Sequence, residues 1–212
     1  MITSARWLTL VFLLGCAAKS LPTAPTGPGM SSTVPIVVGA SCDTHQAEVL
    51  KQADDRATPW STAKHLAKNF GDGKVSWLMK DTAYQSYVVK PAAKDWGRCN
   101  DTGCYVFVAP AGAIHEAVAK SMTDGHHDPA ALGKALGLPA ANFEGTLRMM
   151  TFDFEKDPVC VRLPVDTDPG AYPCKTAEDT DCFKFGGYTS GGTPELMVIN
   201  APVAETTIEE VQ

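Results

Sequence analysis

The chain has 212 residues, with 18 Lys and Arg against 24 Asp and Glu, which gives a formal net charge of −6 at pH 7. A nonspecific nucleic-acid surface needs clustered basic side chains, so this balance argues against one and leaves room only for a small local site. This length can bury one good hydrophobic core and is short for two, so we expect a single globular domain.

The first 16 residues are typical of an export signal that ends at a cysteine. Arg6 precedes an apolar stretch at residues 7–14, which is too short to span a bilayer as a helix. Leu13-Leu14-Gly15-Cys16 then resembles the lipobox of bacterial lipoproteins. The resemblance implies cleavage of a signal peptide at residues 1–15 and diacylglycerol on Cys16. Residue 17 is Ala and not the Asp that retains lipoproteins of some bacteria in the inner membrane, which favours sorting to the outer membrane. The alternative is a buried core helix with an incidental cysteine.

A segment rich in Pro and Gly follows the cysteine. Residues 16–33 carry almost no charge, which predicts a lipidated flexible tether. Removing residues 1–15 takes away Arg6 alone, so 17 basic and 24 acidic residues remain and the net charge becomes about −7. The globular domain is expected over residues 34–212, with a short first strand at residues 34–38.

Six cysteines remain after Cys16, and an even number in an exported chain predicts up to three disulfides. They are Cys42, Cys99, Cys104, Cys160, Cys174 and Cys182. Short loops favour Cys99–Cys104 and Cys174–Cys182, but the sequence cannot choose among all pairings. A metal site is the alternative. We expect none, because neither Cys-x-x-Cys nor Cys-x-x-His spacing occurs.

Early helices followed by mainly β segments predict an α+β class with a mainly antiparallel sheet. Helices are predicted at residues 43–57, from Ser61 or Thr62 to before Gly71, at 111–122, and from an Asp128-Pro129 cap through Leu132 and Leu136. Strands are predicted at residues 84–90, 104–108, 146–154, 159–163 and 195–199, with a polar loop at 91–103.

The strongest local signal is a glycine-rich stretch at residues 185–194 that leads into a strand at Glu195. Glycines let backbone N–H groups approach a ligand closely. A carboxylate at the start of that strand can accept a hydrogen bond from a ribose hydroxyl or stabilise a positively charged centre. The alternative is an ordinary tight hairpin with a solvated Glu195.

Five short segments within residues 84–203 resemble the C-terminal toxin domains of bacterial polymorphic toxin systems. They are Tyr105 to Pro110, Leu132 to Pro139, Thr146 to Arg148, Val161 to Pro164 and Phe185 to Glu195. The order of elements is similar to ADP-ribosyltransferase-like and NAD-glycohydrolase toxins. The arginine of that family's first strand is missing from residues 84–90.

The resemblance implies that NAD is a substrate and that no cofactor is tightly bound. Glu195 and Thr189 would then be catalytic residues, with Ser190, Gly191 and Gly192 binding the ligand. Arg148 or Arg162 would hold the pyrophosphate.

A lipoprotein signal joined to a toxin-like domain resembles the swarm-inhibition lipoprotein toxins of myxobacteria. That resemblance implies transfer between sibling cells by outer-membrane exchange and a cognate immunity protein as partner.

Two other hypotheses stay open. A ribonuclease toxin would use His115 as general base and Arg148 or Arg162 to hold phosphate, although His115 also fits a helix surface. A non-enzymatic outer-membrane lipoprotein would bind a partner instead.

The adjacent His126 and His127 are expected in a solvated loop rather than on a metal.

Overall fold

The computed structural model describes residues 38–212. The predicted signal peptide, Cys16, the tether at residues 16–33 and most of the expected strand at 34–38 therefore lie outside the described residues. Within residues 38–212, no helix is both long and apolar enough to cross a membrane.

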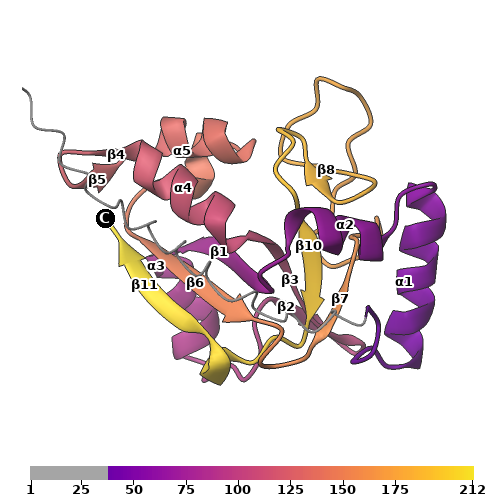
Figure 1. Ribbon diagram of the computed structural model, residues 1–212. Coiled ribbons are helices and arrows are strands. Elements are labelled where there is room, and N and C mark those ends of the chain that lie inside the picture. Colours follow the sequence, from indigo (N-terminus) through magenta and orange to yellow (C-terminus); the bar gives the residue numbers. More distant parts are fainter. Residues whose placement is uncertain (1–37) are drawn as a thin grey trace, which may run out of the picture. The chain divides into compact units, whose positions relative to one another are not determined.

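The domain is built on a seven-stranded sheet in which every pairing is antiparallel (Figure 1). The strand order is β11-β6-β1-β3-β10-β7, and β2 also pairs with β3. The strands are β1 Lys74–Lys80, β2 Arg98–Asn100, β3 Gly103–Pro110, β6 Leu147–Asp153, β7 Cys160–Arg162, β10 Leu196–Ile199 and β11 Thr207–Val211. Two small hairpins are β4 Met122–Thr123 with β5 His126–His127, and β8 Phe183–Lys184 with β9 Tyr188–Thr189.

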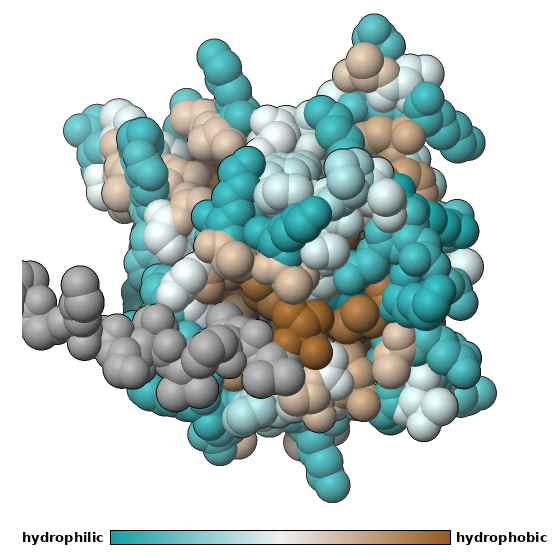
Figure 2. Space-filling view, turned by 45° about the vertical axis from the view of Figure 1, so that its right-hand side comes forward, coloured by the Kyte–Doolittle hydropathy of each residue, from teal (hydrophilic) through white to brown (hydrophobic). Residues whose placement is uncertain are grey.

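Helices cover both faces of the sheet. They are α1 Thr44–Ala57, α2 Thr62–Asn69, α3 Asp81–Tyr84 running into a π-helical turn at Gln85–Val89, α4 Ala111–Ser121 and α5 Pro129–Leu136. Short 3₁₀ turns lie at Ala140–Phe143 and Val203–Glu205. One core packs residues of α1 and α2 against strand residues such as Trp77 and Val198. The other packs α4 and α5 against Leu147 and Met149 of β6. Most of the face seen in Figure 2 is hydrophilic, with hydrophobic side chains gathered in a small central area.

The predicted helix starts are confirmed by their caps. The Asp43 carboxylate accepts from the Gln46 backbone N–H, and the Asp128 carboxylate accepts from Ala130 and Ala131. Pro129 occupies the first turn of α5, and Gly137 ends that helix in the left-handed conformation at φ 69°. Such caps satisfy backbone groups that a helix end leaves unpaired.

The strand predicted at residues 84–90 is wrong, because this segment forms the end of α3 and the π-helical turn. The turn buries Val88 in the core while Tyr87 remains 73% exposed. Packing of Val88, and of Tyr84 against Trp96, has overridden the β propensity of the segment. The expected order of helices before sheet also differs, since α4 and α5 lie between β3 and β6.

Three disulfides stabilise the domain: Cys42–Cys160, Cys99–Cys104 and Cys174–Cys182. The two short-loop pairs are those that the sequence favoured. The third joins the segment before α1 to β7. The mixed α and antiparallel β class is confirmed.

Candidate functional site

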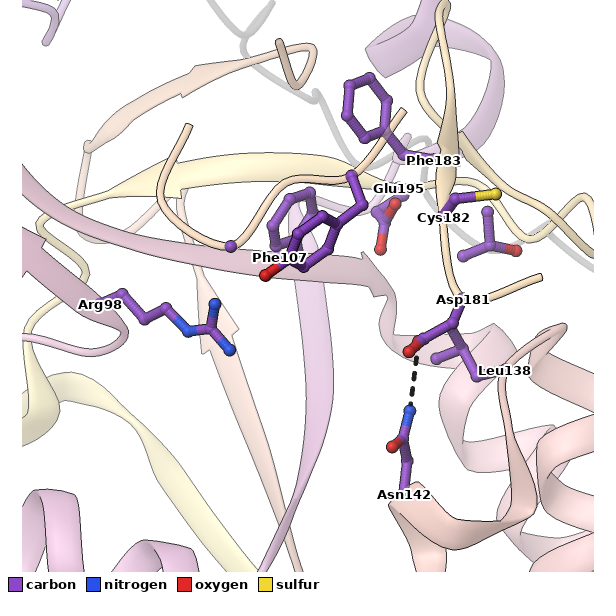
Figure 3. Close-up of a pocket in the computed structure, with 11 residues that line it drawn as sticks. Arg98, Phe107, Leu138, Asn142, Asp181, Cys182, Phe183 and Glu195 are labelled. Carbon is purple, nitrogen blue, oxygen red and sulfur yellow. Dashed lines mark hydrogen bonds between the residues drawn. The ribbon is translucent and has the colours of Figure 1, made fainter. Parts of the chain in front are cut away.

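A pocket of about 290 Å³ opens on the sheet face that bears Phe107 of β3 (Figure 3). Glu195 enters it from the start of β10, and Leu138 borders it just after α5. The loop closed by the Cys174–Cys182 disulfide contributes Asp181 and Cys182, and β2 contributes Arg98. The pocket therefore combines residues from segments far apart in sequence.

A second cavity of about 190 Å³ continues from this pocket beneath α4 and α5, where Ile114 and Phe143 line it. Phe107, Thr189 and Glu195 line both cavities. The Glu195 side chain thus stands at the junction of an open, polar pocket and a more apolar recess.

The Glu195 carboxyl lies in an unusual electrostatic environment. Burial raises its pKa to about 8, because a charged carboxylate loses hydration there. Within residues 38–212 this carboxyl takes part in no hydrogen bond or ion pair that would offset the loss. Glu195 is therefore mostly protonated at neutral pH, and a nearby positive charge would ionise it.

The backbone of Glu195 is held from both sides. Its N–H donates to the Gly187 carbonyl at 2.9 Å, and its carbonyl accepts from His65 Nε2 at 3.1 Å. The Trp60 indole N–H donates to His65 Nδ1 at 3.3 Å, which leaves the imidazole proton on Nε2. His65 is fully buried, and burial lowers its pKa to about 4, so the ring is neutral at pH 7.

Gly187 is needed for this arrangement. Its φ is +80°, and a Cβ there would approach His65 Nε2 to 2.8 Å and the Glu195 carbonyl oxygen to 2.7 Å. The sequence reasoning singled out the glycine-rich stretch but missed His65. A histidine on a short amphipathic helix carries no signal that distinguishes this role from a surface position.

The hydroxyls of the glycine-rich loop serve mainly to dock the loop on α5. Thr189 Oγ1 and Thr193 Oγ1 both donate to the Leu136 carbonyl, at 3.1 and 3.0 Å. Ser190 Oγ donates to the Gly137 carbonyl at 3.0 Å. These bonds satisfy carbonyls at the C-terminus of the helix. Thr189 also lines the pocket with Glu195.

The other predicted ligand-binding residues of this loop lie elsewhere. Gly191 packs on Gly137 so closely that a Cβ on either would collide with the other's backbone. Ser190 and Gly191 line a different cavity, beside Lys134 and Thr180. Gly192 has φ +90° and open space around it.

Arg162 requires a correction as a pyrophosphate-binding residue. Its side chain is 1% exposed. It forms a two-pronged ion pair with Asp168, in which Nη1 lies 2.8 Å from Oδ2, and its Nε donates to Gln46 at 3.1 Å. With its donors occupied in the core, Arg162 has a structural role.

Arg148 and His115 do not join the pocket either. Arg148 on β6 pairs with Asp81 at 2.7 Å and with Glu210 at 3.0 Å. His115 is exposed on α4 and does not line the Glu195 pocket. His126 is exposed, whereas His127 is buried with its Nε2 2.6 Å from the Phe143 carbonyl.

Arg98 also lines the pocket, although nothing in the sequence indicated it as a site residue. Its side chain extends toward the pocket from the β2 side in Figure 3. Opposite it, Asn142 Nδ2 donates to Asp181 Oδ1 at 3.4 Å. The predicted loop at residues 91–103 gave no reason to single out one of its side chains.

In the described part of the chain, no three His, Cys, Asp or Glu side chains are grouped as a metal ion would need. Comparisons with protein-family models, curated proteins and solved structures gave no match.

Proposed function

We propose that this chain is an exported enzyme that cleaves the bond between ribose and nicotinamide in NAD, with Glu195 as the catalytic residue. The observation that carries the proposal is the partnerless Glu195 carboxyl at the junction of two cavities. A carboxyl in a cleft whose pKa is strongly shifted by desolvation is a candidate functional group.

A cationic substrate suits this carboxyl. The nicotinamide ring of NAD is positively charged, and a positive charge close to a desolvated carboxyl favours its ionised form. Binding would therefore expel the proton of Glu195. The resulting carboxylate would face the positive charge that develops on the ribose carbon as the ring departs.

The reaction needs water and no other reagent. The bond from the ribose carbon to the ring nitrogen breaks, and its electron pair neutralises the departing nicotinamide. A water oxygen bonds to the same carbon, and one water proton is released to the carboxylate or to solvent. The products are ADP-ribose, nicotinamide and a proton.

The recess suits a flat ring. Phe107 lines both cavities, and Ile114, Leu136 and Phe143 line the inner one. An apolar site with a few polar groups at one end is the usual form of a small-molecule pocket.

We also propose that this enzyme is a toxin directed at neighbouring bacteria, anchored to the outer membrane through a lipid on Cys16 and neutralised by an immunity protein. The three disulfides support export, since such bonds persist in oxidising compartments. The toxin role is supported by the resemblance of residues 84–203.

The test is nicotinamide release by the oxidised full-length chain, comparing wild type with Glu195→Gln. A matched control is Glu205→Gln, an exposed glutamate that does not line the pocket. We expect Glu195→Gln to lower kcat/KM by at least about 100-fold, the range seen when one transition-state contact is removed, and Glu205→Gln to change nothing. No release by wild type, or equal release by Glu195→Gln, would refute the function.

The raised pKa favours one second candidate. A carboxyl that stays protonated at neutral pH can act as a general acid, donating its proton to a neutral leaving group in glycoside hydrolysis. RNA cleavage through His115 has no comparable support, because His115 and Arg148 do not line this pocket. Cleaved cellular RNA with intact NAD would nevertheless overturn the proposal.

A further inference from the structure

We infer that Arg98 binds an anionic group of the substrate, a phosphate or a carboxylate, and that the Cys99–Cys104 hairpin holds it in place. The inference rests on the proposed active-site pocket but not on NAD as substrate. It follows from the residues around the Arg98 guanidinium and from the lack of a carboxylate partner for it within residues 38–212.

Arg98 differs from the other arginines in residues 38–212. Arg56 pairs with Asp166, Arg148 with Asp81 and Glu210, and Arg162 with Asp168. Arg98 alone among these four has no carboxylate partner in the described part of the chain, although it borders a pocket. An unpaired guanidinium at a pocket is the usual arrangement for binding an anion from outside.

The backbone of Arg98 is fixed at both ends of its strand. Gly97 has φ +104° and lies so close to the Tyr105 carbonyl that a Cβ would overlap it. On the other side, the Cys99–Cys104 disulfide joins β2 to β3, where Arg98 pairs with Tyr105. A hairpin of this size needs such restraints to hold one geometry, because two short strands alone are marginally stable.

The side chain of Arg98 reaches the loop across from it. Its guanidinium lies close to Gly170, since a Cβ there would come within 2.1 Å of Nη1. That loop is itself tied down, since the buried Asp168 holds both Arg162 and the Val165 backbone N–H. Arg98 therefore has a restrained backbone and an exposed side chain whose guanidinium is open to an anion at the pocket.

Arg98 is the only basic side chain among the described residues that line this pocket. Glu195 is mostly protonated at neutral pH and contributes little negative charge. The other acidic residue of the pocket, Asp181, accepts from Asn142. Phe107 lies between Arg98 and Glu195 in Figure 3, so a substrate on this ring would have its anion at one end and its reacting bond at the other.

The test is direct binding to the oxidised full-length chain by NMR titration, with matched sugars. The pairs are ribose 5-phosphate against ribose, and glucuronate against glucose. We expect one charged sugar to bind more tightly than its neutral partner. Arg98→Gln should weaken binding of that sugar by at least about tenfold, since hydrogen bonds to a charged group are stronger than those between neutral groups. The identity of that sugar separates phosphate from carboxylate.

Arg56→Gln is the control, because Arg56 lies outside the pocket, and it should leave binding unchanged. A Cys99→Ser/Cys104→Ser variant should lose several-fold in affinity while keeping a cooperative unfolding transition. Unchanged binding in Arg98→Gln, or no preference for either charged sugar, overturns the inference. Unchanged binding in the Cys99→Ser/Cys104→Ser variant overturns the role of the hairpin. Charged-sugar binding through Arg98 without nicotinamide release would instead refute only the proposed function.

Discussion

His65 Nε2 donates a hydrogen bond to the backbone carbonyl of Glu195, 130 positions further along the chain, at 3.1 Å. This contact joins helix α2 to the start of β10. The residue whose backbone accepts the bond, Glu195, also carries the carboxyl of the candidate site. The imidazole donates this bond from Nε2, and only its neutral form leaves Nδ1 free to accept from the Trp60 indole N–H. The position of the Glu195 side chain, the proposed catalytic group, therefore depends on a buried histidine that does not line the pocket.

His65→Ala should destabilise the domain by about 2–4 kcal/mol, because it creates a cavity and leaves the Glu195 carbonyl without its donor. Urea unfolding measures this loss. His45→Ala on the exposed face of α1 is the control and should change stability little. Equal midpoints for the two variants would show that His65 does not hold this region.

Glu195→Gln should stabilise the folded protein at neutral pH. The carboxyl has a pKa of about 8 in the folded protein, against an ordinary glutamate pKa of 4.5, so folding at pH 7 requires it to retain a proton that the unfolded chain has released. This costs roughly 2–3 kcal/mol at pH 7, allowing for some solvent contact through the pocket. The cost is absent below pH 4.5, grows as pH rises and is complete above pH 8. Thermal unfolding of both proteins at pH 4 and pH 8 checks it, and a gap that did not widen with pH would contradict it.

The disulfides should differ in their contribution to stability. Cys42–Cys160 closes a sequence separation of 118 residues, whereas Cys99–Cys104 closes one of 5. Loop-closure entropy predicts losses of about 5 and about 2 kcal/mol when each pair is replaced by serine. Urea unfolding of the two double variants measures both losses, and the reverse ranking would rule out this explanation.

Asp168→Asn should destabilise the domain by about 3–5 kcal/mol, since it leaves the buried Arg162 without its counter-charge. Asp181→Asn is the matched control, because that residue is exposed at the pocket and bonds only to Asn142. Denaturation curves that shifted equally for both would argue against a structural role for Arg162.

Much of the fold could be predicted because its signals are local. The Asp43, Ser61 and Asp128 caps and the apolar run at residues 104–108 each specify an element within a few residues. Strand β1 was missed because its buried Ser76, bonded to Thr151 at 2.8 Å, breaks the hydrophobic pattern.

The site was harder to predict because it depends on contacts between distant segments. Glu195 and Thr189 could be found since they lie in one glycine-rich stretch. Arg98, His65 and the true partners of Arg162 depend on how β2, α2 and β7 are arranged around that stretch, and their spacing in the sequence gives no sign of it. Arg148 and Arg162 were predicted as phosphate ligands because sequence alone cannot distinguish a free guanidinium from a paired one.

The most direct test of Glu195 as the catalytic carboxylate is the pH dependence of kcat/KM for nicotinamide release from NAD, which reports the ionisation of the free enzyme. We predict that kcat/KM rises with pH and levels off above about pH 8, the pKa of Glu195 in the unliganded pocket, and that the low residual rate of Glu195→Gln shows no such rise. A rate that instead fell as pH rose through 8 would mean that the protonated carboxyl is the active form, and would contradict the proposed mechanism.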